Sequence, residues 1–89
     1  MFNLDDYETV EVRLEKFIKD FPDFRVETEL VSFQNDRYIV KAWLYRTFAD
    51  STPFSSGLAE ETISSRGVNA TSALENCETS AIGRALANA

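Results

Sequence analysis

Residues 24–45 read FRVETELVSFQNDRYIVKAWLY, and the pattern of this stretch decides the fold. From Phe24 to Val31 the side chains alternate between a less polar and a charged set, the period of a half-buried strand. Gln34-Asn35-Asp36 has the chemistry of a turn. Residues 37–48 then form a second run that is rich in aromatic and β-branched residues. The stretch therefore predicts an antiparallel β-hairpin.

The segments on either side of the hairpin extend this pattern. Residues 54–63 alternate weakly and predict a third strand with an irregularity at Gly57. Residues 5–21 place apolar side chains at the three- and four-residue spacing of a helix, and Asp5 with Glu8 is expected to form a capping box. We therefore expect a helix before the hairpin and one more strand after it.

The C-terminal segment returns to helical spacing from Asn69, and Asn69 or Thr71 is expected to cap the first turn. Small residues fill this helix, so we expect it to approach the sheet closely and expect another element to pack near Gly83. Its apolar stripe consists of Leu74, Cys77, Ala81, Ile82, Ala85 and Leu86. The predicted order α-β-β-β-α defines an α+β fold, a three-stranded antiparallel sheet with the helices packed on one face.

We expect residues 1–89 to form a single domain, the N-terminal part of a longer family architecture, because the last helix ends without a basic last turn or a capping glycine. Of the 89 residues 44% are hydrophobic, enough for one small core. With no histidine and one cysteine, zinc clusters, disulfide frameworks and Ser-His-Asp triads are excluded. We therefore expect no enzyme activity, no metal and no cofactor.

The first residues and the hydropathy pattern predict the cellular location of the protein. It has no apolar run of about 18 residues, and its first six residues are acidic and apolar rather than basic. We therefore expect neither a membrane span nor a signal peptide, and a cytoplasmic location.

Charge is distributed unevenly along the chain. The formal net charge is −6, which argues against a general duplex-DNA surface, because many phosphate contacts carry such binding. Residues 35–48 are the exception, since Arg37, Lys41 and Arg46 stand there against Asp36 alone. One basic segment thus lies inside an acidic protein.

The alternation of the second strand divides it into two faces. The uncharged face, which we expect to point to the core, carries Tyr38, Val40, Ala42 and Leu44. The opposite, open face carries Arg37, Ile39, Lys41, Trp43 and Tyr45. Cations that alternate with aromatic rings suit single-stranded nucleic acid, because cations follow phosphates and rings stack on bases. We therefore predict that Arg37, Lys41, Trp43 and Tyr45 bind single-stranded DNA.

An alternative for the same face involves no nucleic acid. Trp43 and Tyr45 would fill a second small core or a subunit contact. Arg37 and Lys41 would pair with Glu27 and Glu29 on the neighbouring strand. The residues alone leave both interpretations open.

The loop before the last helix is a second candidate for binding an anion. Residues 64–69 bring Arg66 and several backbone amides to a helix N-terminus, where negative charge is favourably held. We therefore predict a phosphate contact at Arg66.

Residues 71–89, TSALENCETSAIGRALANA, resemble a segment of bacteriophage single-stranded DNA-binding and recombination proteins. The run SAIGRAL, residues 80–86, is more remotely similar to a helix of the Erf and Rad-type single-strand annealing proteins, whose β-β-β-α core would correspond to residues 24–89. The resemblance implies a non-enzymatic phage protein that binds single-stranded DNA, anneals strands during DNA recombination and acts as a homo-oligomer in the host cytoplasm. Its matching basic positions are Arg37, Lys41, Arg66 and Arg84.

The order α-β-β-β-α also occurs in double-stranded RNA-binding domains, but Asn-Ala-Thr-Ser at residues 69–72 stands where those domains need lysines, so the class is rejected on charge. The leading alternative is a small acidic phage inhibitor or adaptor that binds a host or phage replication protein. Its carboxylate surface would consist of Asp5, Asp6, Glu8, Glu11 and Glu15.

Overall fold

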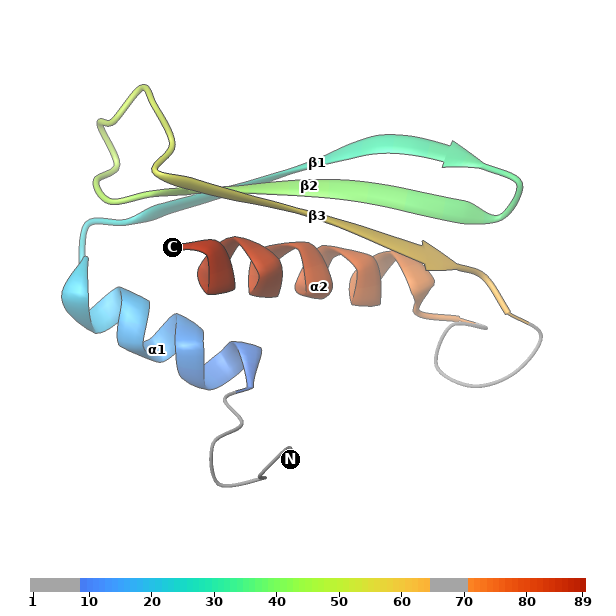
Figure 1. The fold of residues 1–89 in the computed structure, drawn as a ribbon, viewed down its shortest axis with the longest axis horizontal. Helices are drawn as coiled ribbons and strands as arrows, with labels where there is room; N and C mark the ends of the chain where they lie inside the picture. Colours follow the sequence, from blue (N-terminus) through green and yellow to red (C-terminus); the bar gives the residue numbers. More distant parts are fainter. Residues whose placement is uncertain (1–8, 65–70) are drawn as a thin grey trace.

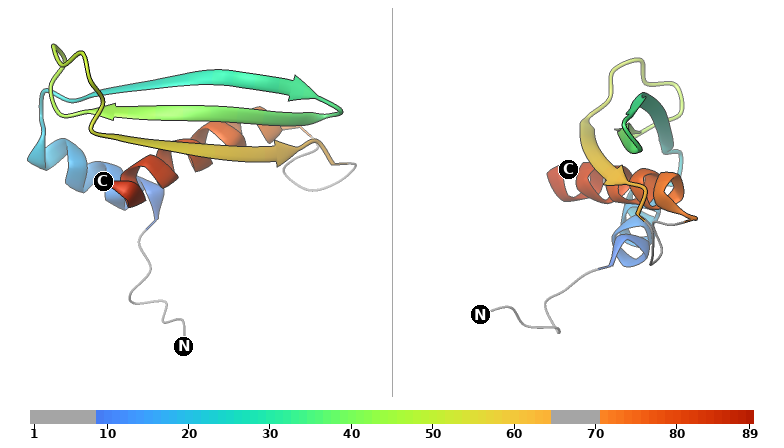
Figure 2. Two further views of the ribbon diagram at one scale, coloured as in Figure 1. Left: turned by 45° about the horizontal axis from the view of Figure 1, so that its top comes forward. Right: turned by 90° about the vertical axis from the view of Figure 1, so that its right-hand side faces the viewer.

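The computed structural model describes residues 9–64 and 71–89 of the chain. The elements are, in chain order, α1 (Val10–Asp20), β1 (Arg25–Gln34), β2 (Arg37–Tyr45), β3 (Ser55–Thr62) and α2 (Ala73–Asn88) (Figure 1). The strands form an antiparallel sheet in the order β1-β2-β3, and both helices lie on the same side of it (Figure 2). The predicted α+β fold is confirmed. Neither helix in the described part of the chain is long and apolar enough to cross a membrane.

The β1–β2 hairpin turns where the sequence predicts a turn. Gln34 pairs with Arg37, so Asn35 and Asp36 form a two-residue connection. Both have positive φ, 54° and 60°, as the two central residues of a type I′ turn require, and Asn and Asp tolerate this region better than most residues. The turn therefore sets the register of the two longest strands.

One residue of β1 is inserted into this register. Leu30 pairs with Val40 and Ser32 pairs with Ile39, so Val31 has no partner of its own and forms a bulge. The sequence instead predicts the irregularity at Gly57, and that prediction is wrong. Gly57 pairs with Ala42 in an unbroken β2–β3 register.

The lack of a side chain at Gly57 instead allows α2 to approach the sheet closely. A Cβ atom at Gly57 would lie 2.6 Å from the Ala81 carbonyl oxygen and would also collide with the backbone nitrogen of Ala85. The Ser55 hydroxyl, two residues earlier in β3, donates a hydrogen bond of 2.5 Å to the Ala85 carbonyl. The backbones of β3 and α2 are therefore in direct contact, as the small residues of α2 predict.

The core lies between the sheet and α2. It is built from Val40, Ala42, Leu44 and Ala59 on the sheet side and Cys77, Ala81, Ala85 and Leu86 on the helix side, with Phe17 from α1. The Cys77 thiol is fully buried and points at the Ala59 carbonyl oxygen, with Sγ 3.3 Å away. Burial raises the pKa of this thiol, so Cys77 is a small core residue rather than a nucleophile.

The helix ends differ in part from those that the sequence predicts. Thr9 has an extended backbone and its Oγ1 accepts a hydrogen bond of 3.2 Å from the Val12 amide, so α1 begins at Val10 and the predicted start at residue 5 is wrong. The expected capping box at residues 5–8 lies outside the described residues. Helix α2 has Ser72 at its N-cap without a side-chain hydrogen bond; Thr71 lies before this cap, and Asn69 is outside the described residues.

Helix α1 is anchored at one end of the sheet by aromatic rings. The Phe17 ring stacks on Phe54 with centroids 5.5 Å apart and meets Phe24 edge-on at 5.8 Å. At the other end of α1, a Cβ atom at Gly83 of α2 would lie 2.7 Å from Cγ2 of Val10. The expectation that another element packs near Gly83 is therefore confirmed.

The contact between β3 and α2 can be tested at Gly57. We expect Gly57→Ala to lower the free energy of unfolding by about 1–3 kcal/mol, the usual cost of overpacking, because the added methyl group meets backbone that cannot rotate away. Urea unfolding followed by circular dichroism measures the change. Thr79→Ala on the exposed side of α2 is the control and should stay within about 0.5 kcal/mol of the wild type. Unchanged stability of Gly57→Ala would contradict the close approach.

Candidate nucleic-acid interface

The two faces of β2 lie as the alternation predicts. Val40, Ala42 and Leu44 are buried against the helices. The other set of side chains, from Arg37 to Tyr45, therefore lies on the face of the sheet that no helix covers. This open face is the surface on which the sequence places four of its six predicted binding residues.

The open face is not basic once the neighbouring strands are in place. The register sets Glu27 opposite Trp43 and Glu29 opposite Lys41, and Arg37 lies 3.8 Å from Glu60 of β3. Counted over the three strands, the face carries the cations Arg25, Arg37 and Lys41 and the carboxylates Glu27, Glu29 and Glu60. The positive charge of residues 35–48 is thus balanced by residues that are distant in sequence.

Tyr45 is occupied by contacts within the domain. The Arg25 guanidinium lies 3.8 Å from the centroid of the Tyr45 ring, and the Tyr45 hydroxyl donates a hydrogen bond of 3.1 Å to Glu27. Only 7% of Tyr45 remains exposed. The Tyr45 ring is therefore packed within the domain between Arg25 and Glu27 and presents little surface for a base to stack on.

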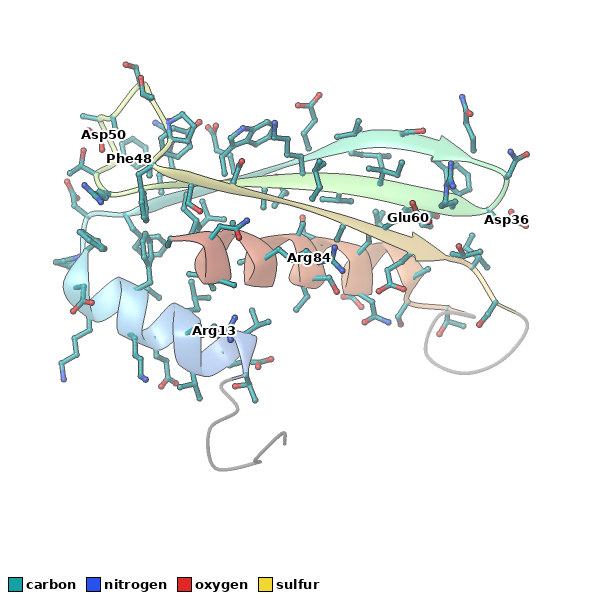
Figure 3. All side chains as sticks on the ribbon, in the orientation of Figure 1. Arg13, Asp36, Phe48, Asp50, Glu60 and Arg84 are labelled. Carbon is teal, nitrogen blue, oxygen red and sulfur yellow. The ribbon has the colours of Figure 1, made fainter. Side chains whose placement is uncertain are left out.

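Arg25 also holds the loop that follows β2. Its guanidinium donates hydrogen bonds of 2.7 Å to the Phe48 carbonyl and 3.0 Å to the Asp50 carbonyl. Asp50 in turn accepts a bond from the Thr47 amide, so the chain turns after Tyr45, and β2 ends three residues before the predicted end at Phe48. Figure 3 shows Phe48 and Asp50 in this loop, beyond the end of the sheet.

Trp43 and Lys41 are the two predicted residues that the structure brings together. The Lys41 ammonium lies 5.2 Å from the centroid of the Trp43 ring, and the ring is only half-buried. Both side chains border a shallow hollow of about 570 Å³ whose other walls are Pro53, Phe54, Ser55, Ser56 and Asn88. The hollow thus combines an aromatic surface, a cation and polar groups, which are the elements of a base-stacking site.

The remaining predicted residues lie elsewhere. Arg37 is six residues from Trp43 along β2, roughly 20 Å at the rise of a strand. Arg84 extends from α2 to the outer edge of β3, where its guanidinium donates a 3.2 Å hydrogen bond to the Leu58 carbonyl (Figure 3). Arg66 lies outside the described residues.

Sequence reasoning missed Arg25 and Phe48. Among the residues that the structure describes, Phe48 is the most exposed large apolar residue, at 67%, and its loop is fixed by a cation 23 residues earlier. The contact between Arg25 and Tyr45 could have been predicted from the register of the hairpin, which sets these two residues opposite each other. No local pattern indicates that the two donors of Arg25 reach the following loop.

The arrangement defines a class of protein: an α-β-β-β-α domain with both helices on one side of an antiparallel sheet and an open face opposite. A family model described as "Slr1353 N-terminal dsRNA-binding domain-like" matches residues 14–89. The chain therefore belongs to the Slr1353 N-terminal dsRNA-binding domain-like family. Comparison with curated proteins and with solved structures gives no significant match.

This membership corrects two interpretations of the sequence. The resemblance of residues 71–89 to phage single-stranded DNA-binding and Erf or Rad-type annealing proteins is wrong, because the match over residues 14–89 is to a different family. Its small-residue pattern reflects the close packing of α2 on β3, which unrelated helices also need. Rejecting the likeness to double-stranded RNA-binding domains on charge was also wrong. The apolar pattern determines the fold, whereas surface charge bears on the ligand.

The role of Arg25 gives a test of this face. We expect Arg25→Lys to lower the free energy of unfolding by about 1–3 kcal/mol, because lysine keeps the charge but lacks the rigid fork whose two nitrogens reach the two loop carbonyls. Arg37→Lys makes the same change at an exposed ion pair and should alter stability by less than about 0.5 kcal/mol. Chemical denaturation of both variants measures the difference, and equal losses would show that Arg25 does not clamp the loop.

Proposed function

We propose that this domain binds nucleic acid without catalysing a reaction, and that unpaired bases stack in the hollow beside Trp43. The observation that carries the proposal is the pairing of a half-buried indole with a lysine at the rim of a hollow at the β3 edge of the sheet, where the uncovered face meets Asn88 of α2. Membership of a family described as double-stranded RNA-binding-domain-like supports nucleic acid as the ligand class. Stacking on Trp43 and a phosphate contact at Lys41 need no large basic surface.

Charge favours unpaired strands over a duplex. Duplex binding is carried mainly by phosphate contacts, and the open face is balanced between three cations and three carboxylates. The described part of the helical side is no more basic. It carries the cations Arg13, Lys16, Lys19, Arg46 and Arg84 together with the carboxylates Glu11, Glu15, Asp20, Glu61, Glu75 and Glu78. We therefore expect modest affinity that depends on stacking more than on ionic strength.

Duplex RNA is the second candidate, because the family description names it. Such duplexes are recognised by shape and by 2′-hydroxyl and phosphate contacts across the minor groove. In this domain the contact would fall on the helical side, where α1 carries its three cations. The two candidates therefore place the ligand on opposite faces.

The proposed non-catalytic role is compatible with the residue types that the chain contains. The chain has no histidine, and its one thiol is buried with a raised pKa. In residues 9–64 and 71–89 no group of three potential ligands could hold a metal ion. The proposal accordingly requires binding alone.

Truncation of Trp43 tests the proposal. A fluorescent single-stranded 12-mer RNA should bind Trp43→Ala roughly 5- to 150-fold more weakly than the wild type, the loss expected when one stacked base is removed. Trp43→Phe should recover part of the affinity, because it keeps an aromatic face. Thermal melts of both variants confirm that they are folded.

The control for the second candidate uses the matched duplex RNA and Lys19→Ala on α1. If unpaired bases are the ligand, Lys19→Ala binds the single strand as the wild type does. Tighter binding of the duplex, with loss in Lys19→Ala and none in Trp43→Ala, would overturn the proposal in favour of duplex RNA.

A further inference from the structure

The two edges of the sheet differ in whether side chains form hydrogen bonds to their backbone groups. At the outer edge of β3 the carbonyls of Leu58 and Ser56 already accept hydrogen bonds from Arg84 and Asn88, at 3.2 and 3.0 Å. Such bonds occupy the edge and hinder another strand from pairing there. No described residue makes a comparable hydrogen bond to the outer edge of β1. The alternation of the ladder places the backbone groups of residues 26, 28 and 30 on that edge.

An apolar groove runs beside the β1 edge, on the helical side of the sheet. It has a volume of about 390 Å³ and is lined by Thr28, Leu30 and Val40 from the sheet and by Thr71, Ser72, Leu74, Glu75 and Glu78 from the start of α2. Leu30 is 50% exposed and Leu74 is 44% exposed. A groove of this volume can hold individual side chains of a bound peptide. No segment of the described chain occupies it.

The charge at the rim of the groove has one sign. Glu75 and Glu78 stand one helical turn apart on α2, and no cation of residues 9–64 or 71–89 lines the groove. The Glu78 carboxylate accepts a 2.8 Å hydrogen bond from the Thr28 hydroxyl, which ties α2 to β1 and fixes one carboxylate beside the edge. Complementary charge on an occupant is therefore positive.

We propose that the β1 edge and its groove form a docking site for an extended, basic and apolar peptide segment of a partner protein, which adds to the sheet as a fourth strand. Backbone hydrogen bonds to the β1 edge supply the affinity, and alternate side chains of the segment enter the groove between Leu30 and Leu74. Its lysine or arginine side chains lie against Glu75 and Glu78. The site is at the opposite edge of the sheet from the Trp43 hollow and does not depend on nucleic-acid binding.

A second copy of this chain fits the site poorly. Antiparallel pairing of two β1 edges would set the carboxylates of Glu75 and Glu78 from both copies beside the same seam, with Glu27 and Glu29 on the opposite side of the strands. Like charges at such distances oppose association. This is why the proposal commits to a basic partner.

The experiment uses synthetic acetylated octapeptides and the whole domain. The first probe alternates lysine with valine or leucine, the second has glutamate in place of lysine, and the third is the first with a central proline, which cannot complete a strand ladder. Isothermal titration at physiological salt measures their affinities. We expect only the first probe to bind, and its binding to shift the backbone amide resonances of Thr28 and Leu30.

Two charge-matched double variants separate the groove from general attraction to an acidic protein. Glu75→Gln with Glu78→Gln should weaken binding of the lysine probe roughly two- to thirtyfold, the effect of removing two partly screened ion pairs. Glutamine at 78 still accepts from Thr28, so the fold is preserved. Glu11→Gln with Glu15→Gln removes the same charge from α1 and should leave the affinity unchanged.

Several results would overturn the proposal. Equal weakening in both double variants would show non-specific attraction, and equal binding of the proline probe would show that no strand is added. Failure of the lysine probe to bind at all would remove the site. A concentration-dependent dimer that Leu74→Glu abolishes would show that a second copy occupies the groove. Trp43→Ala should bind the probe normally, so loss of nucleic-acid binding and loss of this site are distinguishable.

Discussion

The direct contact between the backbones of β3 and α2 is the constraint on which the rest of the structure depends. Because Gly57 has no side chain, the backbone of α2 lies directly against β3 at Ala81 and Ala85. The hydrogen bond from Ser55 to Ala85 fixes the position of the helix along the strand. With α2 in place, Gly83 receives Val10 of α1. Both helices are thereby confined to one side, and the other face of the sheet stays uncovered.

The consequence is a small domain with two surfaces of different chemistry. The uncovered face has balanced charge and a single accessible indole, Trp43, beside Lys41. The helical side has an apolar groove with two carboxylates next to the free edge of β1. At the opposite edge, Arg84 and Asn88 bind the carbonyls of β3. Homo-oligomerisation, expected from the sequence, stays a prediction.

Local patterns predicted much of this fold. Asn35 and Asp36 predicted the hairpin turn, and alternation assigned both faces of β2 correctly. The bulge at Val31 and the role of Gly57 were missed because each depends on which residue of another element lies opposite. The same limit applies to the site. The basic appearance of residues 35–48 disappears when Glu29 and Glu60 pair across the strands, and Arg25 reaches a loop 23 residues away. Charge read along a chain ignores neighbours that the sheet brings together.

An NMR titration of the ¹⁵N-labelled domain with an unlabelled single-stranded RNA decamer identifies most directly the face that binds nucleic acid. The uncovered sheet face predicts that the indole N–H of Trp43 and the backbone amides of Lys41 and Ser56 shift together, while the amides of α1 stay in place. Shifts confined to α1 and the start of α2, with the Trp43 indole unchanged, would contradict the assignment of the ligand to this face.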